Sequence, residues 1–149
     1  MGEIKLTKEQ FESLLKLVYL GEWMINANRT DDRIKKYEDL LSHVFSYVKP
    51  FGFSEYVDDE EAKDGKFYPA RKFEEESDIE KFREEYDEET FWDEIADRLG
   101  ERDFYQHYSK NEIQKMTREE RFEKVYKFID EWAREINEHG IERFKIKVD

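Results

Sequence analysis

Residues 7–20 read TKEQFESLLKLVYL, and this stretch decides the fold class. Thr7 followed three residues later by Gln10 is a capping box, in which each side chain bonds a backbone N–H of the other residue and opens a helix. Apolar residues then recur at helical spacing, and between positions 14 and 20 only Lys16 is polar. We therefore predict a helix over residues 7–28 that is apolar around most of its circumference, as in a central or interface helix.

Similar start and stop signals predict the remaining helices. Asp31 and Asp32 suit the start of a second helix, because carboxylates favour the positive end of the helix dipole. Pro50 and Gly52 stop that helix. Further starts and ends are indicated by Ser77 with Glu80, Gly100, Ser109 with Glu112, Thr117 with Glu120, and Gly140.

The C-terminal tail changes from helical to strand spacing. Phe144, Ile146 and Val148 alternate with lysines, as Ile4 and Leu6 alternate with polar residues near the start. The tail is expected to pair with the first residues or with residues 66–73. Residues 51–76 are least regular and are read either as a small hairpin around Asp64-Gly65 or as a long ordered loop.

The resulting fold prediction is mainly α, within an α+β description. It is a bundle of about five to six helices with a small antiparallel β element that involves the C-terminal tail. Because the 149 residues contain no repeat and no flexible linker, they are expected to form one domain, residues 1–149, with an acidic, less regular segment at about 51–76.

Composition places the protein in a reducing compartment. The chain has no cysteine, which excludes disulfides, thiolate metal sites and cysteine nucleophiles. It shows no apolar leader and no membrane-length apolar run, so we expect a soluble, cytoplasmic protein without membrane contact. Charged residues make up 44% of the chain, a usage that resembles thermophilic proteins.

The net charge of −13 is concentrated in one third of the sequence. Residues 1–53 and 104–149 each balance acids against bases, whereas residues 54–103 carry 21 acids and 8 bases. Such a field repels nucleic acid and attracts basic partners or cations. The predicted acidic interaction surface consists of Asp58, Asp59, Glu60, Glu61 and Asp64. The alternative is a solvated segment whose charge serves only solubility.

The sequence contains no nucleophile elbow, phosphate loop or zinc pattern, so neither a cofactor nor a metal is predicted. The acidic stretch is not an EF-hand loop, because Arg71 stands where such a loop requires a glutamate that binds calcium. Each histidine follows an acid by four residues, which on a helix places the two groups on one face. The three pairs are Asp39 with His43, Asp103 with His107, and Glu135 with His139.

Two functions from different classes follow. The preferred one is a non-enzymatic protein-interaction module that binds a basic protein through an acidic surface and forms a homodimer through the helix at 7–28. The alternative is a metal-dependent enzyme of hydrolase type that uses carboxylates and histidines. Direct nucleic-acid binding is disfavoured, because no basic stripe with interleaved aromatic residues is present.

Overall fold

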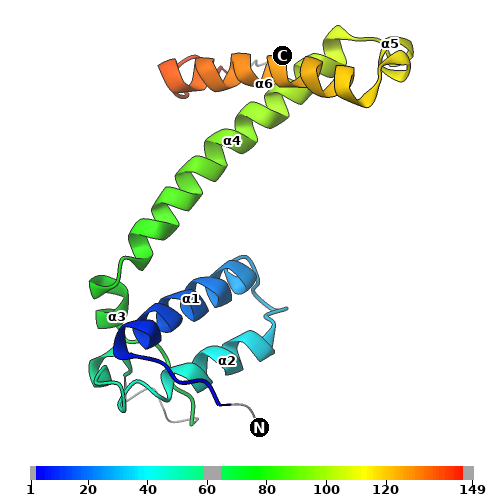
Figure 1. Cartoon of the computed structure of the whole chain (residues 1–149). Helices are drawn as coiled ribbons and strands as arrows, with labels where there is room; N and C mark the ends of the chain where they lie inside the picture. The colour runs from blue at the N-terminus through cyan, green and yellow to red at the C-terminus, as the bar shows by residue number, and fades with distance from the viewer. Residues whose placement is uncertain (1–2, 59–64, 146–149) are drawn as a thin grey trace. The chain divides into compact units, whose positions relative to one another are not determined.

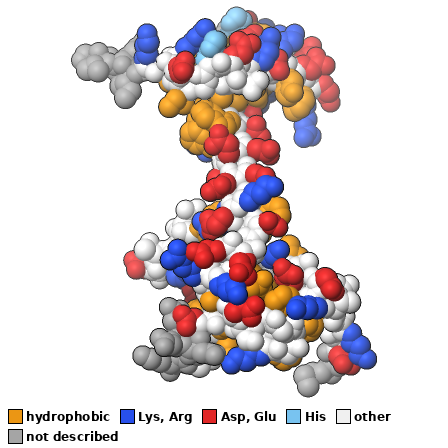
Figure 2. All heavy atoms as spheres, turned by 90° about the vertical axis from the view of Figure 1, so that its left-hand side faces the viewer, with side chains coloured by type: hydrophobic (Ala, Val, Ile, Leu, Met, Phe, Trp, Pro, Cys, Tyr) orange, Lys and Arg blue, Asp and Glu red, His pale blue; other side chains and the backbone are white. Residues whose placement is uncertain are grey.

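A computed structural model of the chain describes residues 3–58 and 65–145, which are mostly helical (Figure 1). Charged side chains cover much of the face drawn in Figure 2. The internal contacts divide the chain into two compact units, residues 1–84 and residues 85–149, and each is described by itself. The helical class is thus confirmed, and the single domain stays a prediction.

The first unit contains three short-to-medium helices and one turn of 3₁₀ helix. Thr7 caps the N-terminus of the first helix as expected, since its side chain accepts from the Gln10 N–H while the Gln10 side chain accepts from the Thr7 N–H. The capping box at Thr7 is therefore confirmed. The elements are α1 (Lys8–Asn26), α2 (Lys35–Phe45), η1 (Ser54–Tyr56) and α3 (Arg71–Glu76).

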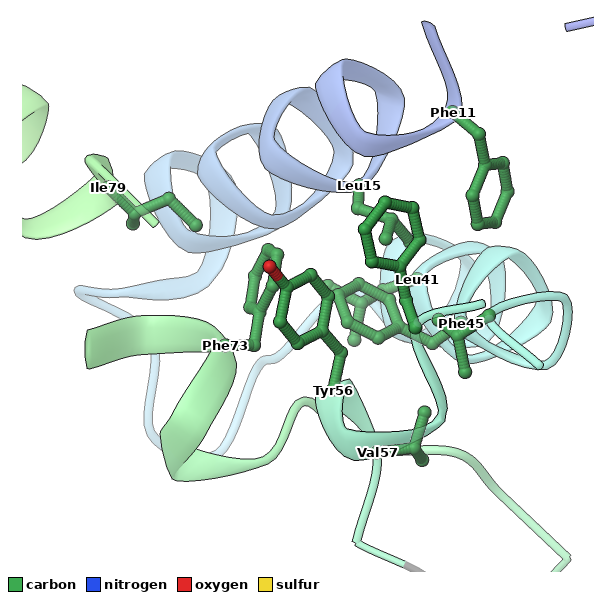
Figure 3. Close-up of a cluster of buried hydrophobic side chains, with 10 residues drawn as sticks. Phe11, Leu15, Leu41, Phe45, Tyr56, Val57, Phe73 and Ile79 are labelled. Atoms are coloured by element: carbon green, nitrogen blue, oxygen red, sulfur yellow. The ribbon is translucent and has the colours of Figure 1, made fainter. Parts of the chain in front are cut away.

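An aromatic core holds these elements together (Figure 3). Phe73 of α3 is fully buried, and its ring contacts Phe45 of α2 at 5.1 Å and Tyr56 of η1 at 5.2 Å. Leu15 of α1 is also fully buried. Large apolar side chains of this kind each contribute roughly 1.5–3 kcal/mol when buried. The buried cluster is Phe11, Leu15, Leu41, Phe45, Val48, Phe53, Tyr56, Val57, Phe73 and Ile79.

A buried asparagine, which the sequence analysis did not single out, fixes the link between α1 and α2. The Asn26 side chain accepts from the Ile34 N–H at 2.9 Å and donates to Glu22 at 2.7 Å. This bond satisfies the backbone at the start of α2, which begins at Lys35. The predicted start at Asp31 and Asp32 is wrong, because Asp32 instead pairs with Arg29 at 2.6 Å before the helix begins.

The small β element that we predicted is not supported. The only β pairing among residues 3–58 and 65–145 is an isolated antiparallel bridge between Val57 and Pro69. Proline has no N–H to extend such a ladder. The nearby Phe67 N–H donates to the Ser42 hydroxyl of α2 at 2.8 Å instead of to a second strand. Phe144 follows a turn, and Ile146 and Val148 lie outside the described residues.

Tyr19 ties α1 to α3. Its hydroxyl donates to Glu74 at 2.6 Å, and its ring packs against Phe73 at 5.6 Å. Partial burial raises the pKa of the Tyr19 phenol well above its ordinary value, and the bond to the Glu74 carboxylate raises that pKa further. The neutral phenol is therefore the form that the first unit holds.

The second unit consists of the later part of α4 followed by two helices. Two further capping boxes are confirmed, since Ser109 accepts from the Glu112 N–H and Thr117 accepts from the Glu120 N–H. Gly140 ends the last helix with a φ of +55°, which glycine tolerates. The elements are α4 (Ile79–His107), α5 (Lys110–Lys115) and α6 (Arg118–His139).

Two predicted boundaries of α4 are wrong. Ser77 does not cap this helix: its hydroxyl is buried without a hydrogen-bond partner among the described residues, and its backbone ends α3 instead. Gly100 does not end the helix either, because it lies inside α4 and is buried. A Cβ at Gly100 would come within 2.6 Å of the Ile129 backbone. The missing side chain allows α6 to cross α4 at this point.

The core of the second unit is small. Phe104 is fully buried, and its ring contacts those of Tyr108 and Phe128. Ala96 and Ile136 are the other buried apolar side chains found in residues 85–145. Several aromatic residues stay largely exposed instead, among them Phe91 at 51%, Phe122 at 70% and Tyr126 at 58%.

Candidate functional site: an acidic segment of α4

The acidic segment, defined here as residues 85–97 of α4, is the most strongly charged part of the second unit. It contains seven carboxylates and no lysine or arginine. All seven are exposed, and Figure 2 shows acidic side chains along α4. Because the helix brings residues three or four apart together, these like charges repel along its surface. The seven are Glu85, Asp87, Glu88, Glu89, Asp93, Glu94 and Asp97.

Local contacts hold two of these carboxylates in place. The Trp92 indole N–H donates to Glu88 at 2.6 Å, and Arg98 forms an ion pair with Glu94 at 2.8 Å. The Phe91 and Trp92 rings meet edge to face at 4.8 Å. The segment thus presents a mixed surface, in which the exposed Phe91 ring and the half-buried Trp92 ring stand between carboxylates.

A cleft of about 560 Å³ adjoins the segment, between α4 and α6. It lies beside the crossing that Gly100 permits, and the apolar side chains of Trp92, Ala96 and Ile136 line it. Glu88 and Asp93 stand on its α4 side. An apolar cleft next to carboxylates suits a side chain that combines an aliphatic stem with a positive head, as lysine and arginine do.

The acidic surface predicted from the sequence lies elsewhere. Asp58, its first residue, is exposed after η1. Asp59, Glu60, Glu61 and Asp64 lie outside the described residues. The excess of acids in residues 54–103 covers most of α4, so the sequence did indicate an acidic region there. It did not indicate which of these acids share one helix.

The three predicted acid–histidine pairs use their acids in other ways. Asp39 pairs with Lys66 at 3.1 Å, and Glu135 pairs with Arg143 at 3.1 Å. Asp103 accepts from the Trp132 indole N–H at 2.7 Å and from Arg102 at 2.8 Å. In the described part of the chain, no three His, Asp or Glu side chains stand close enough together to hold a metal ion.

A smaller cavity of about 240 Å³ lies in the first unit, between Tyr19, Leu41 and Tyr68. Its charged side chains bind one another: Arg33 contacts both Glu22 and Glu38. These ion pairs support the α1–α2 link described above. The cavity is therefore a less suitable candidate than the acidic segment.

Comparison with protein-family models, with curated proteins and with solved structures gives no match. Among the described residues, no helix combines the length and the apolar character needed to cross a membrane.

Proposed function

We propose that the chain is a non-enzymatic protein-interaction module whose acidic segment binds a basic protein. One observation carries this proposal: residues 85–97 expose seven carboxylates without a single lysine or arginine. Phe91 and Trp92 lie within the same segment, so apolar contact is available beside the charge. Aromatic residues are enriched where proteins bind one another.

Charge and apolar surface contribute differently to such binding. Seven adjacent carboxylates raise the association rate of a positively charged partner and repel nucleic acid. The cleft beside Trp92 supplies a place where a partner side chain can leave water, which is where most binding energy arises. The expected partner is therefore a basic helix or loop with at least one apolar anchor.

Two finer expectations remain proposals. A homodimer through α1 is supported by the exposed side chains of Leu17 and Met24, which are 68% and 58% exposed, while Phe11 and Leu15 are already used in the core. A cytoplasmic location is supported by the absence of cysteine from the sequence. No observation on the described residues favours the metal-dependent alternative.

Peptide binding to the intact chain tests the proposal. The probe is a fluorescein-labelled 18-residue peptide of lysine and leucine at amphipathic-helix spacing, followed by fluorescence anisotropy. Replacing Asp87, Glu88, Asp93 and Glu94 by their amides should weaken binding at least tenfold. The amides keep the size of each side chain and, at position 88, an acceptor for Trp92.

A charge-matched variant provides the control. Amides at Asp31, Glu119, Glu123 and Glu131, all exposed and all outside the segment, remove the same four charges. This variant should bind the peptide within about twofold of the parent chain. Equal losses in both variants would show that only the net charge matters, and undetectable binding by the parent chain would refute the proposal.

A further inference from the structure

The second unit exposes more apolar surface than its own core can use. Among its described residues the buried apolar side chains are Ala96, Phe104 and Ile136, while Tyr86, Phe91 and Tyr105 of α4 are each 51% exposed. A unit of about 65 residues is marginally stable even with a full core. A contact that covers the exposed part of α4 would therefore stabilise the unit as well as bind a partner.

One face of α4 carries two of its exposed aromatic residues, Phe91 and Tyr105, linked by positions three or four apart, whereas Tyr86, which is also 51% exposed, lies on another face. From Asp87 to Arg98 the face of Phe91 and Tyr105 is turned away from Gly100, where α6 crosses, whereas farther along α4 the Arg102 guanidinium lies 5.6 Å from the centre of the Trp132 ring of α6. Asp87, Phe91, Glu94 and Arg98 border one shallow surface depression, so they lie together. The face, named here the pairing face, continues at the same spacing to residues 102 and 105. Its members are Asp87, Phe91, Glu94, Arg98, Arg102 and Tyr105.

The two halves of the pairing face have opposite charge. The charged members of the half from 87 to 94 are carboxylates, whereas those of the half from 98 to 105 are arginines, with the exposed Glu101 at its border. Arg121 of α6 adds a third guanidinium, which stands 5.7 Å from the centre of the Tyr105 ring and donates to its hydroxyl. The side chains of Arg98 and Arg102 are 80% and 49% exposed. A surface with one acidic and one basic half is complementary to itself when turned around.

We propose that a second copy of this chain covers the pairing face, with the two α4 helices antiparallel. This inference rests on the proposed function and names the partner, because the basic surface that meets the acidic segment then belongs to the same protein. A two-fold arrangement makes each contact twice.

The spacing along α4 allows both contacts at once. Phe91 and Tyr105 are 14 residues apart, which is about 21 Å along a helix. If Phe91 of one copy faces Tyr105 of the other, Glu94 faces Arg102, and Arg98 lies near the two-fold axis. Glu94 already pairs with Arg98, and Arg102 with Asp103, so the dimer would join existing pairs into a network.

The net charge of −13 on each copy opposes association. At physiological ionic strength, however, exposed charges farther apart than about 8 Å are largely screened. The contacts of the pairing face then matter more than the net charge. Because each copy contributes mainly one helix, we expect a reversible dimer with a Kd on the order of micromolar.

Sedimentation equilibrium of the full chain with charge-reversed variants tests the proposal. The parent chain should reach twice the 18.4 kDa monomer mass across the micromolar range. A variant with Asp87→Arg and Glu94→Arg, and a second variant with Arg102→Glu and Arg121→Glu, should each raise Kd at least tenfold. Equal mixtures of the two variants should recover the dimer, since every acidic half then faces a basic half.

Glu85→Arg with Glu89→Arg provides the matched control. These positions make the same charge change on α4, on the side away from the pairing face, and should leave Kd within about threefold. Circular dichroism of each variant verifies that the helices persist. The recovery in mixtures is the decisive result, because a misfolded variant cannot be rescued by its complement.

The outcomes separate this inference from the proposed function. A parent chain that stays monomeric but binds the basic peptide through residues 85–97 overturns the dimer and keeps the interaction module. A dimer that the charge reversals leave intact but Leu17→Glu dissociates also overturns the pairing face, in favour of α1. A third outcome is also possible: the parent chain dimerises, the two charge-reversed variants dimerise only when mixed, and the parent chain does not bind the peptide. This result supports the inference while the broader function fails.

Discussion

The two units of this chain differ in how they use aromatic residues. In the first unit, Phe45, Tyr56 and Phe73 converge on one core, and each is at most 7% exposed. In the second unit, Phe104 is fully buried, but Phe91 and Phe122 stand at the surface. The first unit has enough internal contact to fold around its own centre. The second leaves large apolar side chains exposed, which is the surface that the proposed function uses.

The comparison separates stability from function. A buried aromatic ring contributes its apolar area to folding, whereas an exposed one contributes to binding only when a partner arrives. The seven like charges of the acidic segment destabilise α4, and under the proposed function they would raise the association rate of a basic partner. The substitutions below test this division, from the largest expected effect to the smallest.

Truncation of the central phenylalanines should give the largest effect. Phe73→Ala and Phe104→Ala each remove a side chain with no exposed surface, and such changes cost about 3–5 kcal/mol. We expect Phe73→Ala to shift unfolding of the first unit alone, and Phe104→Ala to abolish the fold of the second. Urea titration followed by tryptophan fluorescence checks this in chains that retain either Trp23 or Trp132.

Phe122→Ala is the matched control, because the Phe122 side chain is 70% exposed. It should change the free energy of unfolding by less than about 0.5 kcal/mol. A cost for Phe122→Ala as large as that for Phe104→Ala would mean that the second unit has a covered core, and the contrast between the units would be lost.

Asn26→Ala should cost the first unit about 2 kcal/mol. The substitution leaves the Ile34 N–H without the side-chain oxygen that now accepts from it at 2.9 Å, and buried groups left unsatisfied carry most of such a penalty. Chemical denaturation observed at Trp23 measures the change. If Asn26→Ala leaves stability unaltered, the α1–α2 link is held by the ion pairs of Arg33 instead.

Gly100→Ala tests the helix crossing in the second unit. The new methyl group would meet the Ile129 backbone, so α4 and α6 must separate, at a cost of about 1–3 kcal/mol that the better helix propensity of alanine offsets by about 1 kcal/mol. Thermal unfolding measures the net loss. Gly21→Ala in α1, where nothing lies within 4 Å of the added carbon, should instead stabilise the chain.

Tyr19→Phe should lower the stability of the first unit by about 1 kcal/mol at neutral pH, through loss of the bond to Glu74. The folded state raises the pKa of Tyr19 above its ordinary value of 10.0. The stabilisation by Tyr19 is thus complete below pH 10 and is lost as pH rises further. Urea titrations at pH 7 and above pH 10 should show the difference between parent and variant shrinking.

The sequence predicted helix ends better than it predicted contacts. Thr7, Ser109 and Thr117 could be assigned because a capping box is local, and Gly140 because a helix end favours glycine. Gly100 looked the same but serves a crossing with Ile129, which is distant in the sequence. Local patterns cannot distinguish a glycine that ends a helix from one that lets another helix approach.

The candidate site was predictable only in its charge. The acids of residues 54–103 were visible as a group, and the structure places eleven of them on α4, seven within residues 85–97. The sequence did not show which carboxylates pair with other side chains. Asp39 binds Lys66 and Asp103 binds Trp132, and these partners lie 27 and 29 residues further along the chain. Spacing in the sequence therefore suggested histidine pairs that these contacts replace.

The exposed stretch of α4 over residues 84–91 has a consequence for backbone exchange. No side chain there is buried, and acids four apart, such as Glu84 with Glu88 and Glu85 with Glu89, weaken the helix by about 0.2–0.5 kcal/mol per pair. Amide hydrogens in these turns should exchange with deuterium faster than those of α1. Added salt or a bound cationic surface should lower the exchange rate of these amide hydrogens, because either one reduces the repulsion between the carboxylates. The exchange rate in this stretch should therefore report on binding.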